Sequence, residues 1–242
     1  MRSEPFRPAA AWLRAYLYFV ACGVFAYSTG ALDALLSSRF VPSNAGALWW
    51  LCSAALLVFI TVAYGVLWSR WTLRFNRKLD VFPQLIFGLS WGIGYALSFL
   101  GFWHLSLIAG DGWPTWAVFL LAYTLISLWQ VLWQDLVWDI YVSPEHDTPW
   151  TTKVKVPCTH VPNVTFSLLY FVAFDAYWGF VAAQVLALTL CSFAMRMPAP
   201  WCKDVTPAAT RHPFVFGLSH GGGYVSPDPA NDPHLKAIGA PY

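Results

Sequence analysis

The sequence has few charged residues. Asp, Glu, Lys and Arg make up 11% of its 242 residues, whereas soluble domains average about 25%. So few charges leave too little polar surface to face water on all sides. The formal net charge is only +2, so the basic surface that nucleic-acid binding needs is also missing. An ordinary soluble domain and a nucleic-acid partner are therefore both excluded.

Cysteine patterns are missing as well. The five cysteines are scattered and no CxxC occurs, which excludes a disulfide framework and a zinc ribbon. Cys22, Cys52 and Cys191 lie inside apolar runs, where a thiol behaves as a small hydrophobe. The chain also has no HxxxH, HExxH or paired Glu-x-x-His, so no familiar metal motif is present. The sequence specifies no cofactor.

Apolar and aromatic residues are abundant instead. Hydrophobic residues make up 58% of the chain and aromatic residues 18%, with fifteen tryptophans. They gather in runs near or above the roughly 18 residues that span a bilayer. This pattern predicts an all-α integral membrane protein, a tryptophan-rich bundle of about five transmembrane helices with an irregular C-terminal tail. The predicted helices cover residues 12–32, 47–68, 84–108, 114–142 and 164–194.

The predicted organisation has three parts. Residues 1–11 form an N-terminal cytoplasmic segment, residues 12–198 the transmembrane helical domain, and residues 199–242 an extramembrane tail rich in Pro, Gly, Asp and His. The fifth run is longer than one span needs, so we expect it to be tilted or to begin in the interface.

Two glycines four residues apart, Gly88 and Gly92, lie in the third run. Small residues at this spacing let a second helix approach closely in a membrane. The alternative is that glycine is simply common in membrane helices. The sequence leaves both interpretations open.

The positive charges predict an orientation. Nine of the fourteen Lys and Arg lie in the first 14 residues and in the loops that follow the second and fourth helices, while the opposite short loops hold only Arg39. Positive charge marks the cytoplasmic side, so we expect a multi-pass protein with its N-terminus in the cytoplasm. Five helices then put the C-terminus on the opposite side, although the four cations from Arg196 onwards weaken this prediction. The sequon at Asn163 would face the wrong side for glycosylation or lie too close to the bilayer.

Carboxylates in or near apolar runs are the candidate catalytic residues. Asp135 and Asp139 lie four residues apart, on one face of the fourth helix. Asp175 falls within the fifth run. Carboxylates at membrane depth are costly and usually face a bundle interior or a wet cavity. For Asp135 and Asp139 the alternative is a structural role at the headgroup level. For Asp175 it is a structural pairing with Asn163, Gln184 or a tyrosine.

The loop after the fourth helix offers metal ligands. Glu145, His146 and His160 provide oxygen and imidazole groups that suit zinc, iron or copper. Two prolines separate the histidines, and no motif requires them to meet. A solvated interfacial loop that contacts lipid headgroups is the alternative interpretation.

Three functions remain open. The first is a polytopic membrane enzyme that acts on a lipid or isoprenoid, a hydrophobic small molecule, by acid/base chemistry from Asp135, Asp139 and Asp175. The second is a non-catalytic subunit of a larger membrane complex of respiratory, photosynthetic or oxygenase type, whose tail docks on other subunits. The third is a protein with an interfacial metal site.

Overall fold

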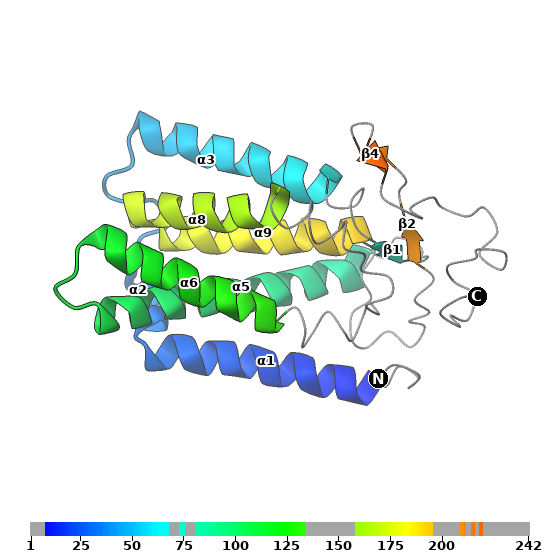
Figure 1. Ribbon diagram of the computed structural model, residues 1–242, viewed down its shortest axis with the longest axis horizontal. Coiled ribbons are helices and arrows are strands. Elements are labelled where there is room, and N and C mark those ends of the chain that lie inside the picture. The colour runs from blue at the N-terminus through cyan, green and yellow to red at the C-terminus, as the bar shows by residue number, and fades with distance from the viewer. Residues whose placement is uncertain are drawn as a thin grey trace.

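The computed structural model describes residues 8–67, 73–75, 81–133 and 158–195, together with three short strands in the tail. Helices account for nearly all of this part of the chain, as the sequence predicted. The strands have two or three residues each. Figure 1 shows the longer helices lying roughly side by side in one bundle.

The helices begin and end close to the predicted runs. Two elements form each of the first and second runs, a single helix forms the third, and one helix forms the described part of the fourth. The bounds are α1 Pro8–Ser28, α2 Ala31–Ser37, α3 Ala47–Ile60, the π-helix η1 Thr61–Leu67, α5 Val81–Ala109, α6 Thr115–Trp133, α8 Val161–Phe174 and α9 Tyr177–Met195.

Two helices are long and apolar enough to cross a membrane. They are Ala47–Leu67 with 21 residues and Gln84–Ala109 with 26 residues, and α1 with α2 gives a third if this bent pair counts as one span. Three shorter apolar helices, Thr115–Gln130, Cys158–Phe174 and Tyr177–Phe193, accompany them. The described residues are therefore consistent with membrane insertion, but their lengths support two or three full spans rather than five.

The first predicted helix is not continuous. It ends at Ser28, and α2 begins after a bend of 79°. Gly30 lies at the bend with a φ of 76°, a left-handed conformation that glycine adopts without steric cost. The prediction of one helix over residues 12–32 was wrong because hydropathy does not register a bend between two apolar segments.

The fifth predicted helix is a helical hairpin. Asn163 in α8 donates a hydrogen bond of 3.2 Å to Gln184 in α9, although 21 residues separate them. A straight helix of that length would hold the two about 30 Å apart. The chain reverses at Asp175, which ends α8 in the left-handed conformation. The prediction of one helix over residues 164–194 was therefore wrong.

The hairpin changes where the chain ends. α1 begins and α9 ends at the same end of the bundle, on the right in Figure 1. At this end the strand β1 Leu73–Phe75 pairs antiparallel with β2 Ala209–Arg211 from the tail. A second pair, β3 Phe214–Val215 with β4 Leu218–Ser219, follows. The tail thus pairs with the loop that follows the second predicted helix.

The helix α5 lies at the centre and packs against α1, α2, α6 and α9. Its contact with α9 is very close: a Cβ added at Gly88 would lie 2.5 Å from the Cα of Thr189, and one at Gly92 would lie 2.5 Å from the Cα of Val185. The close-approach interpretation of these two glycines is confirmed.

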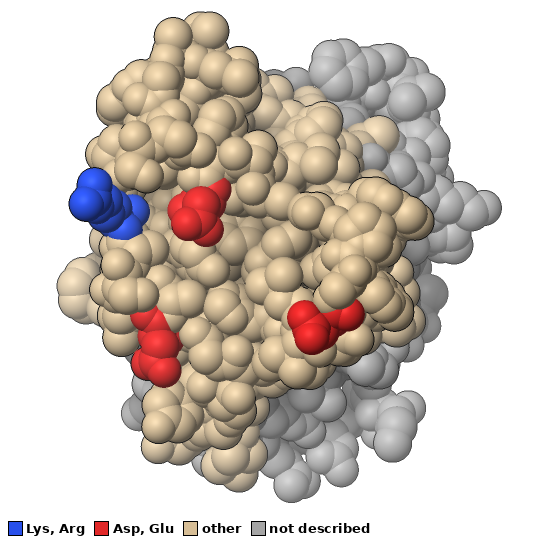
Figure 2. Space-filling model, turned by 90° about the vertical axis from the view of Figure 1, so that its left-hand side faces the viewer, with Lys and Arg blue, Asp and Glu red and all other residues tan. Residues whose placement is uncertain are grey.

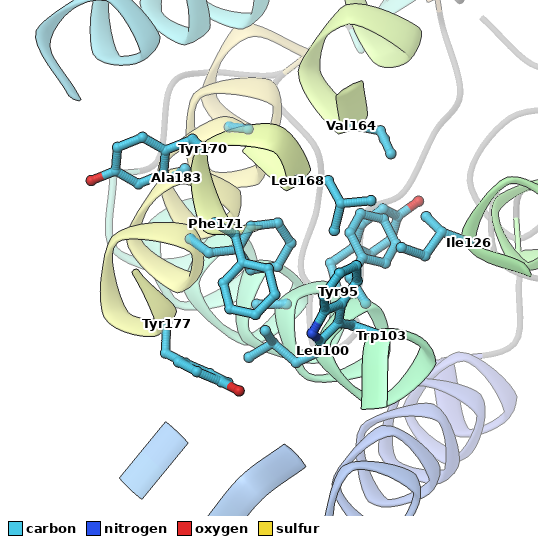
Figure 3. Close-up of a cluster of buried hydrophobic side chains, with 14 of the residues drawn as sticks. Tyr95, Leu100, Trp103, Ile126, Val164, Leu168, Tyr170, Phe171, Tyr177 and Ala183 are labelled. Atoms are coloured by element: carbon cyan, nitrogen blue, oxygen red, sulfur yellow. The ribbon is translucent and has the colours of Figure 1, made fainter. Parts of the chain in front are cut away.

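Aromatic side chains fill the space between α5, α6, α8 and α9 (Figure 3). Phe171 contacts several of these aromatic rings. The centre of its ring lies 4.8 Å from that of Tyr177, 5.5 Å from that of Phe180 and 5.7 Å from that of Trp103. Leu168 and Ile126 are almost fully buried beside this group. This packing fixes α8 against the rest of the bundle.

Candidate functional site

The charged side chains that the structure describes lie at one end of the bundle. Figure 2 looks onto the end where α1, α5 and α8 finish, and it shows carboxylates and a basic side chain on an otherwise uncharged face. The charged residues whose side chains the structure describes are Asp33, Asp111, Asp175 and Arg39. The apolar middle of the described bundle therefore holds no carboxylate.

Asp175 lies in the hairpin turn and is exposed. It lies at the same end of the bundle as the other described charged residues. The expectation that Asp175 lies well within one long helix was wrong, because the fifth run reverses there. A catalytic role for Asp175 stays a prediction, although the burial that motivated it is absent.

A histidine and a tyrosine meet near this turn. His104 Nε2 and the Tyr177 hydroxyl share a hydrogen bond of 3.0 Å. This contact ties the end of α5 to the start of α9.

Among the residues that the structure describes, no group of three or more His, Cys, Asp or Glu side chains could hold a metal ion.

Most of the other predicted site residues lie outside the described part of the chain. These are Asp135, Asp139, Glu145 and His146. Their roles therefore stay predictions. His160, the third predicted metal ligand, is described, and among the described residues it contacts Tyr64.

A polar cluster does lie inside the bundle, at the contact of η1, α8 and α9. His160 Nδ1 and the Tyr64 hydroxyl share a hydrogen bond of 2.9 Å, and the Tyr64 side chain also neighbours the Asn163 amide. The Ser167 hydroxyl donates to Asn163 Oδ1 at 3.1 Å. We call this group the Tyr64 cluster: Tyr64, His160, Asn163, Ser167 and Gln184.

The spacing of its members explains how the sequence assembles the cluster. His160, Asn163 and Ser167 follow one another at intervals of three and four residues, so they share one face of α8. The Asn163–Gln184 hydrogen bond shows that this face is turned toward α9. The hairpin then brings Gln184 alongside. Tyr64 belongs to η1. Short π-helical segments are frequent at functional sites.

Burial within the cluster is almost complete. Tyr64, Ser167 and Gln184 are 0% exposed and Asn163 is 2% exposed, whereas His160 is only partly buried. One donor, Gln184 Nε2, has no hydrogen-bond partner. A buried polar group without a partner costs about 1–3 kcal/mol. His160 is thus the member that can meet a molecule from outside, and Gln184 is the member with an unused donor.

The sequence reasoning missed most of this cluster. Asn163 and Gln184 stand out only as amides within an apolar run, and a tyrosine such as Tyr64 is ordinary in a membrane helix. Polar groups inside membrane segments mark functional positions, so both amides were candidates. Their contact could not be predicted while the fifth run was taken as one helix.

These features define the class of the protein. It is a bundle of apolar helices consistent with membrane insertion, with the four described charged side chains at one end and a buried polar cluster between three helical elements. No protein-family model, curated protein or solved structure matches the chain significantly.

Proposed function

We propose that the protein is a polytopic membrane enzyme that acts on a lipid or other hydrophobic substrate by acid/base chemistry at the Tyr64 cluster. The observation that supports this most is the hydrogen bond of 2.9 Å between the partly buried His160 and the fully buried Tyr64. Imidazole changes its charge near neutral pH, which suits a general acid or base.

The two residues have different roles in this proposal. His160 is the group that exchanges a proton with the substrate, because Tyr64 is fully buried. Tyr64 is a positioning residue whose hydroxyl holds the imidazole in one orientation. Asp135 and Asp139, which precede the segment that leads to His160, remain proposed acid/base partners, and Glu145 and His146 remain proposed metal ligands with His160.

The experiment compares lipid extracts from host cells that express the wild-type chain, His160→Gln or Tyr64→Phe. Both substitutions should abolish or strongly reduce any change in lipid composition that the wild-type protein causes. Tyr170→Phe is the matched control, because it also removes a tyrosine hydroxyl from an inter-helix hydrogen bond, that of 2.8 Å with Ser53. This control should leave the lipid change intact.

Two results would contradict the proposal. One is a wild-type protein at full expression that leaves every lipid species unchanged. The other is a lipid change that persists in His160→Gln. A stable complex recovered with other subunits after mild solubilisation, together with either result, would favour the non-catalytic subunit instead.

We also propose a multi-pass arrangement in which the N-terminal segment and the tail both face the cytoplasm. The shared end of α1 and α9 and the pairing of β1 with β2 support this arrangement. All fourteen Lys and Arg except Arg39 belong to segments that begin or finish at this end. With the tail in the cytoplasm, its cations also lie on the cytoplasmic side, as the positive-inside rule expects. In the five-helix arrangement these cations lay on the opposite side.

A further inference from the structure

Three tryptophans are exposed on the surface of the bundle. Among the tryptophans whose side chains the structure describes, only Trp50, Trp113 and Trp116 are exposed, at 54–67%. Tyr27 is exposed to a similar degree, at 66%. These four residues belong to the end of α1, the start of α3, the turn before α6 and the start of α6. We call them the aromatic belt.

Contacts between helices place Tyr27 at the level of the start of α9. The helices α1 and α5 run parallel, and the contacts between them join residues 76 positions apart, such as Cys22 with Ser98. By the same register, Tyr27 lies at the level of Trp103, the residue before His104. His104 is hydrogen-bonded to Tyr177, the first residue of α9.

Trp50 lies at the same level on another side of the bundle. The helices α3 and α8 run antiparallel, joined by the 2.8 Å hydrogen bond of Ser53 with Tyr170 and by the ring contact of Phe59 with Phe166. This register sets Trp50 opposite the last residues of α8, beside the turn that leads into α9. The helix α3 packs on α8 and α9, whereas α1 packs on α5, and Figure 1 shows α1 and α3 at opposite edges of the bundle.

Trp113 and Trp116 complete the belt at the α5–α6 turn. From His104, α5 continues to Ala109 before the turn begins, a further rise of about 8 Å at the helical rise per residue. Trp116 is the second residue of α6, which runs back toward the middle of the bundle. The aromatic belt therefore occupies a band roughly 10 Å deep, at the end of the bundle opposite the start of α1.

The described surface changes in character on the two sides of the belt. Toward the middle of the bundle, the same helices expose aliphatic side chains: Val20 on α1, Leu57 on α3 and Leu120 on α6. The four described charged side chains lie at the end that carries the belt. Tryptophan and tyrosine between aliphatic and charged surface are typical of a membrane–water interface. A protein partner would cover one side of the bundle, whereas this pattern repeats on helices at opposite edges.

We propose that the aromatic belt binds the interface of a phospholipid bilayer, with its rings among the headgroups and ester carbonyls of one leaflet. This inference goes beyond the proposed function, because it depends on the membrane arrangement but not on the chemistry of the Tyr64 cluster. It also fixes the depth of the bundle. The α8–α9 turn with Asp175 lies at the level of the lipid interface, and the α5–α6 turn with Asp111 lies roughly 10 Å farther out.

The test measures the tryptophan fluorescence of the full chain in phosphatidylcholine vesicles. The lipid carries bromine, which quenches indole fluorescence, either near the carbonyl end of its acyl chains or near the middle of the bilayer. A variant that combines Trp50→Phe, Trp113→Phe and Trp116→Phe loses the fluorescence of the three belt indoles. Shallow bromine should quench this lost part more strongly than deep bromine does. Trp103→Phe is the matched control, because Trp103 lies at the level of the belt but is only 7% exposed, so the part lost in this variant should be quenched less by shallow bromine.

Two outcomes would overturn the inference. One is quenching of the belt indoles by deep bromine that equals or exceeds quenching by shallow bromine. The other is quenching by iodide in the surrounding water with none by brominated lipid, which would indicate a surface for a water-soluble partner. The three single variants replace the combined one if it does not fold. The proposed function fails separately: normal belt quenching with no lipid change in wild-type cells would leave the membrane interface and remove the enzyme.

Discussion

At the scale of single residues, the close approach of α5 and α9 depends on the absence of two Cβ atoms. A methyl group at Gly88 or Gly92 would meet the backbone of α9 at 2.5 Å, far inside ordinary contact. Backbone moves less readily than the end of a side chain, so the two helices would have to separate. Overpacking of this kind costs about 1–3 kcal/mol or more.

We therefore expect Gly88→Ala and Gly92→Ala each to lower the midpoint of thermal unfolding of the purified protein in detergent. Gly23→Ala is the control, since a Cβ there has nothing within 4 Å and alanine is the better helix former. It should leave the midpoint unchanged or raise it. A loss of stability in Gly23→Ala equal to that in Gly88→Ala would contradict the close contact.

At the scale of elements, the α8–α9 hairpin depends on a residue with positive φ in its turn. Asp175 has φ 53° and ψ 39°, and it is the only residue other than glycine with positive φ in the described chain. Asp and Asn adopt this conformation more readily than most residues, and the left-handed region costs other residues about 1–2 kcal/mol.

Asp175→Val should therefore lower the free energy of unfolding by about 1 kcal/mol, whereas Asp175→Gly and Asp175→Asn should be close to neutral. Asp111→Val is the control, because Asp111 is also exposed in a turn but has no positive φ. Thermal or denaturant unfolding in detergent measures the differences. Equal effects of valine at both positions would argue against a strained turn at Asp175.

The Asp175→Asn variant also tests the role predicted from the sequence. It keeps the turn and removes the carboxylate. If Asp175 acts only in the turn, the lipid change that the wild type causes in cells should persist in this variant. Loss of that change with normal stability would restore Asp175 as a catalytic residue.

At the scale of the whole molecule, the proposed arrangement in the membrane rests on one feature of the described helices: α1 begins and α9 ends at the same end of the bundle. A green fluorescent protein fused after Tyr242 should be fluorescent in a bacterial host, because it folds in the cytoplasm. An alkaline phosphatase fused after Asp111, in the turn between α5 and α6, should be active because it is exported; this turn lies at the opposite end of the bundle (Figure 1).

The controls exchange the two reporters, and each should then be inactive at the exchanged position. The protein should also remain in the pellet after alkaline extraction and ultracentrifugation. An active phosphatase after Tyr242 would contradict the cytoplasmic tail and favour the opposite location that five helices predict. Recovery in the supernatant would contradict the membrane arrangement as a whole.

The sequence predicted properties of single segments well, but it did not predict which segments contact one another. Run lengths and low charge determined that the chain is an apolar helical bundle, since hydropathy is a property of each segment by itself. The spacing of Gly88 and Gly92 indicated a close helix contact, because four residues place both on one face. The polar character of Asn163 and Gln184 was visible, but their partners were not.

The sequence by itself determined the helical class, the apolar character and the concentration of positive charge in a few loops. Tertiary structure alone decided that the last apolar run reverses at Asp175, that Asn163 meets Gln184, and that Tyr64 meets His160. The physical reason is that hydrophobicity is equally satisfied by one long helix or by two short ones. Only packing against α5, together with the hydrogen bonds of the buried amides, distinguishes the two.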